Sequence, residues 1–544
     1  MCSEPTASVA EATAARCLLC NIGCPVRLAQ GGPDRYVPDY VPQAGYAGLC
    51  GRGSVLAELV DHPGRFLEAH RRAARQDSGR VGGAAATQEA AAALRAADSA
   101  AIIADGSLDL DALAAVGRLA AACKARWSVF VPPSDAGLVH GLDAAGCTFI
   151  GPEDLAAAGA LLLIGNVCAT HPVAAHWIFE ARFKRRRMPV LVMADASGVT
   201  ADFATSVFQP RLAAGEAARA VSAIRTGQPG SLGPEAKALA AWKDLLGKGE
   251  SPAIVVSADL GYADARALGG EVARLAGEVR ARVCPLTTYG NAWGAVRLAA
   301  SAGAVPVEEI LTDPPRTLMI IGADLESALG KRAVAAALEK VQRLIYVGPM
   351  PNLASCRASL VLPAAFAFES AGRALLGPGR EVRVGPLLCP PAGVPTVSEV
   401  LADLGAGAGA PADVAGAVTV AAGKDGATAH DESRDGLLLA LARDAFHFAD
   451  GSLTRQAAWP QVVRGRPLLV MAEADARAAG LADGGRAMVE GPGGSVEVGV
   501  AAIAAQRAGQ ARVSAGFAEV RDVFGWTWEG TRPGDPVRVR VRKV

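Results

Sequence analysis

Four cysteine residues near the amino terminus constrain this chain more than any other feature. Cys17, Cys20 and Cys24 lie in the stretch "RCLLCNIGCPVRL", and Cys50 follows in "AGLCGRGS", so the spacing is C-x2-C-x3-C-x25-C. Three thiolates from one loop can converge on one face of a metal centre, and a fourth can close the site from a distant segment. Four thiolates suit a [4Fe–4S] cluster or structural zinc, but zinc sites more often use two separated C-x2-C pairs. The spacing therefore favours an iron–sulfur cluster, with zinc or a purely structural set of thiols as alternatives.

The composition is that of a large globular chain without net charge. Of the 544 residues, 51% are hydrophobic and 20% are charged, and Lys+Arg and Asp+Glu both number 54. This balance produces no field that would attract nucleic acid or an anionic membrane surface. The basic run "FKRRRM" (183–188) is short and follows a helical pattern, so it indicates a solvated helix end or a contact with a partner.

The cysteines indicate in which cellular compartment the protein is expected. Eleven cysteines occur in a sequence without a secretory signal, and no segment has the pattern of a membrane span. Clustered cysteines in a reducing compartment more often bind metal than form disulfides. We therefore expect a cytoplasmic protein with metal-binding cysteines, no membrane span and no nucleic-acid partner.

Short apolar runs alternate with Ala-rich helical stretches through the middle of the chain. "SAAIIADGS", "ALLLIGNV" and "MPVLVMADAS" form one series, and "SPAIVVSADLG", "RTLMIIGADLE" and "QRLIYVGPMP" form a second. Buried parallel strands alternating with helices have this signature, and ligands bind beyond the carboxyl ends of such strands. The candidate binding residues at those ends are Gly165, Asn166, Asp195, Gly322 and Asp324.

The carboxyl-terminal part changes character. A hairpin is predicted around residues 492–494, and "PVRVRVRKV" alternates strictly, which is typical of a small β-barrel. The expected fold is therefore α/β. It comprises a small N-terminal iron–sulfur domain (10–72), two doubly wound α/β domains (80–230 and 240–402), a linker (403–450) and a C-terminal β-barrel (455–544).

Together these motifs resemble those of the molybdopterin oxidoreductase family, which includes formate dehydrogenases, formylmethanofuran dehydrogenases and the large iron–sulfur subunit of respiratory complex I. The cysteine spacing matches the family's cluster motif. In "LCGRGS", Arg52 stands where a lysine usually lies between cluster and pterin. "LLLIGNVCATHPV" is similar to the family segment beside a pterin, and "VLVMADASGVTADFA" resembles the next strand, whose Asp binds a guanosine. "ASLVLPAAFAFESAGRALLGPGREVRVG" and "MAEADARAAGLADGGRAMVEGPGG" also resemble family segments, the second at the start of a dinucleotide-binding barrel.

The resemblance implies two cofactors. One is a [4Fe–4S] cluster on the four cysteines, which passes single electrons to or from a bis-pterin site. The other is a molybdopterin guanine dinucleotide. Its implied cofactor-binding residues are Arg52, Gly165, Asn166, Asp195, Gly322, Asp324 and Glu369. From the residues alone, a salt bridge is the better explanation of Arg52.

The sequence departs from the family at the metal ligand. Formate and formylmethanofuran dehydrogenases hold the metal by a cysteine or selenocysteine followed by histidine, in a stretch like Val-Cys-His-x-Pro-Ser. The matching stretch "WSVFVPPSDAG" places Phe130 and Val131 at those two positions. A phenyl ring cannot ligate Mo or W, and a valine cannot relay a proton. Cys123, Cys147 and Cys168 have the pattern of buried apolar residues, so the catalytic residues stay unassigned.

Three functions fit these observations. The first is an iron–sulfur electron-transfer subunit that lacks a catalytic Mo or W centre and docks flavin or iron–sulfur subunits in a hetero-oligomer. The second is an active Mo/W bis-pterin enzyme of formate dehydrogenase type. The third is a scaffold in a complex like formylmethanofuran dehydrogenase that carries out formyl transfer or hydrolysis. We expect the first, because Phe130 and the short chain argue against the second and the four cysteines argue against the third. Whether the chain is itself an enzyme is left open.

Overall fold

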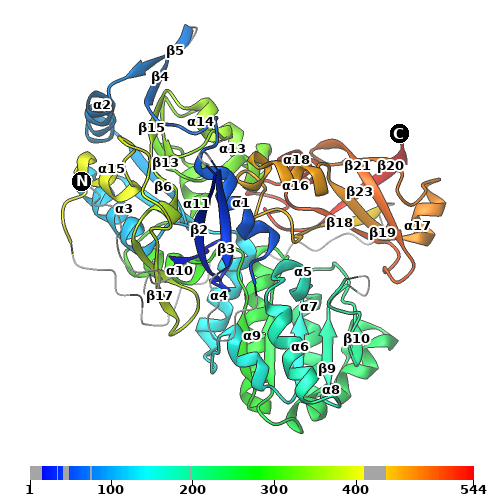
Figure 1. The fold of residues 1–544 in the computed structure, drawn as a ribbon. Coiled ribbons are helices and arrows are strands. Elements are labelled where there is room, and N and C mark those ends of the chain that lie inside the picture. The colour runs from blue at the N-terminus through cyan, green and yellow to red at the C-terminus, as the bar shows by residue number, and fades with distance from the viewer. Residues whose placement is uncertain are drawn as a thin grey trace.

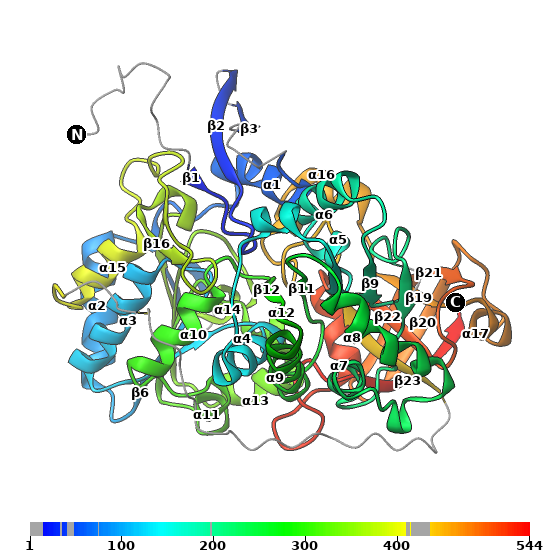
Figure 2. The same cartoon turned by 90° about the horizontal axis from the view of Figure 1, so that it is seen from below.

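The computed structural model describes residues 15–32, 35–40, 48–73, 76–195, 198–409, 414 and 436–544. Two parallel α/β sheets lie side by side, and a closed β-barrel packs against them (Figure 1). The amino-terminal strands lie over the junction between the two sheets, as the view from below shows (Figure 2). This confirms the expected α/β class and the carboxyl-terminal barrel.

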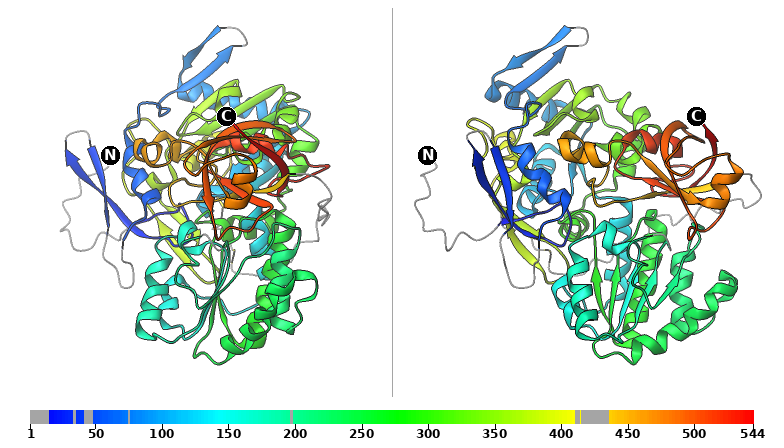
Figure 3. Two further views of the ribbon diagram at one scale, coloured as in Figure 1. Left: turned by 90° about the vertical axis from the view of Figure 1, so that its right-hand side faces the viewer. Right: turned by 45° about the vertical axis from the view of Figure 1, so that its right-hand side comes forward.

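The amino-terminal part is a small antiparallel sheet followed by one helix. Its strands are β1 (Ala15–Arg16), β2 (Pro25–Gly32) and β3 (Arg35–Tyr40), and α1 (Gly51–Val60) follows. The β2–β3 hairpin extends away from the body of the molecule (Figure 3). The cysteine loop lies at the opposite end of β2, between β1 and β2.

The larger sheet has seven strands in the order β5-β4-β15-β14-β13-β6-β7. Its central strands are parallel, and β4 runs antiparallel to β15. The strands are β4 (Ala69–Ala73), β5 (Gln76–Val81), β6 (Ala100–Asp105), β7 (Arg126–Phe130), β13 (Thr317–Ile321), β14 (Arg343–Gly348) and β15 (Leu360–Pro363). The helices associated with it are α2 (Gly83–Ala96), α3 (Leu110–Cys123), α10 (Ala292–Ser301), α11 (Val307–Thr312), α12 (Leu325–Leu329), α13 (Lys331–Leu338), α14 (Leu353–Arg357) and α15 (Val397–Leu404).

The smaller sheet has five parallel strands in the order β10-β9-β8-β11-β12. The strands are β8 (Leu161–Ile164), β9 (Val190–Met193), β10 (Ser206–Phe208), β11 (Ala253–Val256) and β12 (Arg282–Pro285). The helices on and around it are α4 (Pro133–Ala145), α5 (Val167–Thr170), α6 (Ala174–Lys184), α7 (Glu216–Thr226), α8 (Leu239–Gly247) and α9 (Tyr262–Val279).

Both sheets are buried on both faces, which explains why their strands are continuous apolar runs. In β8, Leu162 and Ile164 join the core cluster that contains α7–α9, whereas Leu161 and Leu163 join the cluster that contains α6. All four side chains are 3% exposed or less. The alternation of a strand therefore places successive apolar residues in two separate cores.

The two sheets do not follow the order of the chain. The seven-stranded sheet takes β6 and β7 from the first predicted α/β segment (80–230) and β13–β15 from the second (240–402). The five-stranded sheet, built from residues 161–285, is inserted between these two groups. The expected division at residues 230–240 therefore does not coincide with the division between the sheets, because strand pairing is set by long-range packing.

The carboxyl-terminal barrel has the strand order β18-β22-β19-β21-β20-β23. Its elements are β18 (Leu437–Ala442), β19 (Leu468–Ala472), β20 (Arg486–Gly491), β21 (Gly494–Ile503), β22 (Gln510–Ser514) and β23 (Val537–Lys543), with α16 (Ala458–Val463), α17 (Glu473–Ala478) and α18 (Ala518–Phe524). The predicted hairpin is the β20–β21 turn. The barrel starts at β18, inside the predicted linker, and most of that linker lies outside the described residues. A two-stranded ribbon, β16 (Gly372–Leu375) and β17 (Glu381–Val384), completes the strands.

None of the helices in the described parts of the chain combines the length and the hydropathy that crossing a bilayer requires.

Candidate functional site

The cysteine loop is held in place by its own backbone and by Asn21. The amide of Cys17 donates to the carbonyl of Cys24 at 2.9 Å, which closes the loop between β1 and β2. The side-chain amide of Asn21 donates to the carbonyls of Pro285 at 2.8 Å and Leu376 at 2.9 Å, and its Oδ1 accepts from the amide of Thr287 at 2.9 Å. These bonds fix the loop on the carboxyl end of β12.

The four thiols of the motif act on one another. Cys17, Cys20 and Cys24 are buried, and Cys50 is half-buried at the N-cap of α1. Burial raises the pKa of Cys20 to about 11, and the pKa values of Cys17 and Cys24 also rise, first through burial and then through the charges of the other thiols. All cysteines within the described ranges are free thiols.

Among the described residues, no group of three or more His, Cys, Asp or Glu side chains is placed to hold a metal ion. The thiols of Cys17 and Cys20 also accept hydrogen bonds from the amides of Leu19 and Ile22, which favour their charged forms. The four-thiolate cluster therefore stays a prediction from the spacing of the cysteines.

Arg52 lies beside these thiols in the first turn of α1. Its side chain is buried, hydrogen-bonds to Cys50 and donates from Nη2 to the carbonyl of Thr170. Its buried Nε has no hydrogen-bond partner within the part of the chain that the structure describes. A buried donor without a partner is costly, so this atom marks the site as incomplete without a further group.

A chain of polar contacts leads from Arg52 to the centre of the molecule. The hydroxyls of Thr170 and Ser257 lie 3.2 Å apart, and Arg443 donates from Nη2 to Ser257 Oγ at 2.9 Å. His171 is buried beside this chain, with Nδ1 3.0 Å from the Thr170 hydroxyl and Nε2 3.0 Å from the carbonyl of Thr287. Both ring nitrogens of His171 are therefore engaged, as expected for a packing residue.

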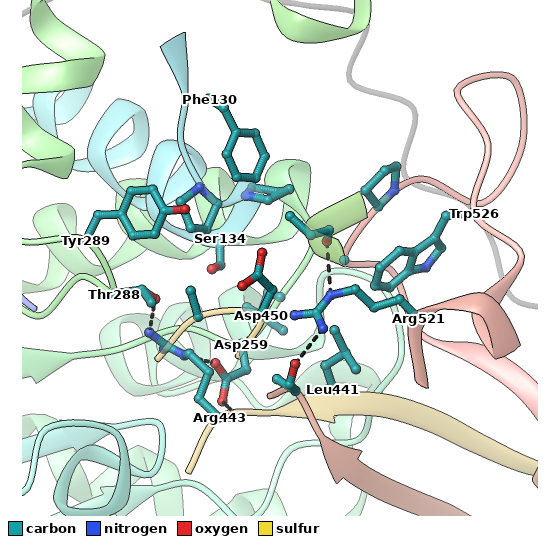
Figure 4. Close-up of a pocket in the computed structure, with 18 residues that line it drawn as sticks. Phe130, Ser134, Asp259, Thr288, Tyr289, Leu441, Arg443, Asp450, Arg521 and Trp526 are labelled. Atoms are coloured by element: carbon teal, nitrogen blue, oxygen red, sulfur yellow. Dashed lines mark hydrogen bonds and ion pairs between the residues drawn. The ribbon is translucent and has the colours of Figure 1, made fainter. Parts of the chain in front are cut away.

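Arg443 occupies the centre (Figure 4). It directly follows β18 of the barrel and forms an ion pair with Asp259, which lies beyond the end of β11. Its guanidinium also donates to the Thr288 hydroxyl and to the carbonyl of Ala258, the latter at 2.7 Å. The barrel thus places a cation where the carboxyl ends of the five-stranded sheet converge.

Aromatic rings fill much of the remaining space. Phe130, at the end of β7, is 4% exposed and meets Tyr289 edge to face, with ring centroids 6.4 Å apart. Tyr289 stacks on Phe448 at 5.5 Å. The central pocket that Phe130 and Arg443 line has a volume of only about 90 Å³. Phe130 therefore lies in the central pocket but supplies an apolar ring rather than a ligand. Val131 follows it and lines an adjacent cavity.

The carboxyl ends of the larger sheet surround a second small cavity of about 150 Å³. The predicted residues Gly322 and Asp324 lie here, together with Asp105 and Asp450. Burial raises the pKa values of Asp105 and Asp324 to about 6, and the neighbouring charge of Asp450 adds to both shifts. Asp324 accepts from the amide of Leu353 at 3.0 Å and caps α12, so its carboxylate is engaged by the chain itself.

Gly165 and Asn166 lie at the carboxyl end of β8, as predicted, and both are partly exposed. Gly165 has φ +85°, and a Cβ on it would lie 1.9 Å from the carbonyl oxygen of Ser257, so backbone packing requires glycine there. The Oδ1 atom of Asn166 accepts from the hydroxyl of Thr200 at 2.8 Å.

Two predicted acidic residues form ion pairs within the chain. Asp195, which follows β9, pairs with Arg512 of the barrel strand β22 and accepts from Gln209 Nε2 at 3.3 Å. Glu369 pairs through both oxygens with Arg65, with Oε1 2.8 Å from Nη1, and the Glu369 side chain is fully buried. The structure thus brings Arg52 to the cysteine loop but directs Asp195 and Glu369 towards arginines.

The two cavities beside the predicted residues are small, about 90 and 150 Å³. Of the residues predicted to contact a pterin dinucleotide, Asp195 and Glu369 form ion pairs with arginines of the same chain. Sequence reasoning missed Arg512 and Arg65, which supply the cations of these pairs, and Arg443, which pairs with Asp259. Each of these arginines pairs with a residue far away in the chain, so local sequence gives little indication of its role. Arg443 alone has a local feature, because it directly follows an apolar strand.

No family model matches this chain, and no curated protein matches its sequence. Among solved structures, the chain is similar to acetylene hydratase from Pelobacter acetylenicus, with a TM-score of 0.74 and 11% sequence identity. The alignment covers 98% of this chain and 100% of that chain. At this identity the likeness bears on the fold alone. The chain shares the overall fold of that protein, with parallel-sheet α/β parts and a closed carboxyl-terminal β-barrel.

Proposed function

We propose that this chain is an iron–sulfur electron-transfer subunit of a multi-subunit redox complex, built on a molybdopterin oxidoreductase-like fold without a Mo or W centre. The observation that carries the proposal is the contrast between two sites. The cysteine loop is ordered around four free thiols and an unpartnered arginine donor. The central pocket, by contrast, is narrowed to about 90 Å³ by the side chains that line it, among them Phe130 and Arg443.

The four cysteines would hold a [4Fe–4S] cluster. Such a cluster, when bound, supplies one-electron transfer with little rearrangement. Arg52 would place its positive charge beside the thiolates and stabilise the more negative, reduced state. Asn21 would keep the loop rigid through its three hydrogen bonds to distant parts of the chain.

The central pocket supports the absence of a catalytic metal. A metal-ligating thiolate would have to replace Phe130, whose ring packs against Tyr289. A bound pterin would have to displace Arg443 from Asp259 and Ser257 and leave both charges buried, which is strongly destabilising. These contacts argue against the formate dehydrogenase type of enzyme.

Electrons would then be exchanged with other subunits. The described residues offer no further cluster of metal-ligating side chains, so the chain would need partners that carry flavin or further clusters, in a hetero-oligomer. Cys50 is the least buried of the four cysteines, so the route to a partner would leave the cluster at the N-terminus of α1. We expect this complex in the cytoplasm, where the thiols stay reduced before assembly.

Metal analysis of anaerobically purified protein tests the proposal. We expect about four iron and four sulfide per chain, neither Mo nor W, and a dithionite-reducible visible absorbance with an electron paramagnetic resonance signal. Cys20→Ser should abolish both signals. Cys356→Ser changes an exposed thiol outside the motif and serves as the matched control.

The other functions give different results. Stoichiometric Mo or W with a released pterin would overturn the proposal in favour of an active bis-pterin enzyme. Protein that folds without iron would instead favour the non-redox scaffold. Iron content decides between these two functions, since the packing of the central pocket is compatible with an electron relay and with a scaffold. A cluster that dithionite cannot reduce would also contradict electron transfer.

A further inference from the structure

A cavity of about 720 Å³ adjoins the central pocket and is lined by residues of α4, α9, α10, α11 and the barrel loop 528–536. These helices lie on one side of the molecule (Figure 2). Phe130 and Pro133 line both this cavity and the central pocket, so they form the wall between the two. The volume is in the range that encloses a small molecule, about 300–1,000 Å³.

The walls are apolar because the lining residues are small or aliphatic. Alanines from α4, α9 and α10 (Ala136, Ala263, Ala295, Ala299 and Ala300) leave the space open, and Val131 and Val307 add aliphatic surface. Val131 stands at the position where the family resemblance would place a proton-relaying histidine. With valine there, this side of the cavity offers dispersion contacts and no acid–base group.

Several charged groups at the cavity are engaged by the chain, and Glu309 adds a further carboxylate to its lining. Arg532 pairs with Glu308 at 3.2 Å, and its amide donates to Asp535 Oδ2 at 3.1 Å. Asp264 accepts from the amide of Gly215 at 2.9 Å. An anion would meet these carboxylates, whereas an uncharged molecule would leave the pairs undisturbed.

His140 supplies a polar group on the wall formed by α4. Its Nδ1 lies 2.7 Å from the hydroxyl of Tyr262, which orients the ring. Burial lowers the pKa of His140 to about 4, so the ring is uncharged near neutral pH. Within the described residues no hydrogen bond engages Nε2, and this nitrogen is available to a ligand in the cavity.

We propose that this cavity binds an uncharged, mainly apolar ring compound that carries one hydroxyl or carbonyl group, with His140 Nε2 as the hydrogen-bonding partner of that group. The ring system packs against the alanines of α10, and the polar group meets His140. The inference depends on neither the iron–sulfur cluster nor any pterin, because none of the four cysteines lines the cavity.

Titration of the full-length protein with three matched probes tests the proposal. The probes are 2-naphthol, naphthalene and 2-naphthoate, followed by probe fluorescence and isothermal titration calorimetry at pH 7. We expect 2-naphthol to bind about five- to tenfold more tightly than naphthalene, which corresponds to one hydrogen bond of about 1 kcal/mol. The anion should bind at least tenfold more weakly than 2-naphthol. Equal or tighter binding of 2-naphthoate, or no binding of 2-naphthol, would overturn the proposal.

Variants locate the site. Ala299→Phe fills the cavity and should weaken 2-naphthol binding at least tenfold, whereas Ala241→Phe on the exposed face of α8 is the matched control. His140→Phe should remove the preference for 2-naphthol over naphthalene while both still bind. If Ala299→Phe does not fold, Ala300→Phe, nearer the surface, serves instead. Unchanged affinity in a folded cavity-filling variant would place the binding elsewhere and refute the inference.

Discussion

Replacement of Phe130 by alanine tests whether the centre of the molecule is a packed core rather than a cofactor cavity. The ring is 4% exposed and contacts Tyr289 edge to face. Burial of a Phe side chain contributes about 1.5–3 kcal/mol. A new void of about 80 Å³ costs about 2 kcal/mol, and loss of the aromatic contact adds about 1 kcal/mol.

The existing pocket reduces the loss of unfolding free energy expected from these contributions. Because about 90 Å³ beside the ring is already open, part of the phenyl surface has no neighbour to lose. We therefore expect Phe130→Ala to lower the free energy of unfolding by about 3–4 kcal/mol, within the usual range for such substitutions.

Urea unfolding followed by tryptophan fluorescence measures this loss. Phe183→Ala is the matched control, since that ring is 76% exposed on α6, and its effect should stay within about 0.5 kcal/mol. A loss below about 1 kcal/mol for Phe130→Ala would refute the reasoning. It would mean that the ring is not packed and that the centre can open to admit a larger group.

Three further predictions concern residues first expected to bind cofactor. Glu369→Gln leaves Arg65 as an uncompensated buried cation and should lower the unfolding free energy by about 3–5 kcal/mol in urea titrations; a neutral result would mean that water reaches the pair. Gly165→Ala forces a Cβ against the carbonyl of Ser257 at positive φ and should lower the free energy of unfolding by about 2 kcal/mol or more, measured by urea titration; wild-type stability would show that the backbone can shift. Burial raises the pKa of Asp324 to about 6, so the folded state binds a proton that the unfolded state has released. Stability therefore falls as pH rises from about 4 to 6, by on the order of 3 kcal/mol for this group. Asp324→Asn should flatten that dependence in denaturant titrations across this range, and an unchanged slope would assign it to other groups.

The features of the candidate site that depend on local sequence were predictable. The positions of Gly165, Asn166, Gly322 and Asp324 at strand ends follow from apolar runs that stop at Gly, Asn or Asp, and the structure places them there. Their surroundings were not predictable. Asp195 meets Arg512, and Glu369 meets Arg65, through pairs whose members are far apart in the chain. A sequence pattern reports which side chain follows a strand but not which distant cation packs against it.

The arrangement of the domains also could not be predicted from local sequence patterns alone. Each apolar run became a strand buried on both faces, because only a parallel sheet covered by helices can bury such runs completely. The sheet that a strand joins is not set by its local sequence. Strand β13 pairs with β6, although the whole five-stranded sheet lies between them in the chain. Adjacent strands in the chain are only the commonest neighbours in space, so a consecutive pair of domains was the natural but incomplete expectation.

The sequence by itself determined the α/β class, the carboxyl-terminal barrel and the set of four cysteines, because periodicity and spacing act over short stretches of chain. Only the tertiary structure decided what lies at the centre. It brought Arg443 from the barrel against Asp259, set Phe130 edge to face with Tyr289, and stacked Tyr289 on Phe448. Those contacts join segments that share no local pattern, and they form because buried charges need partners and buried space must be filled.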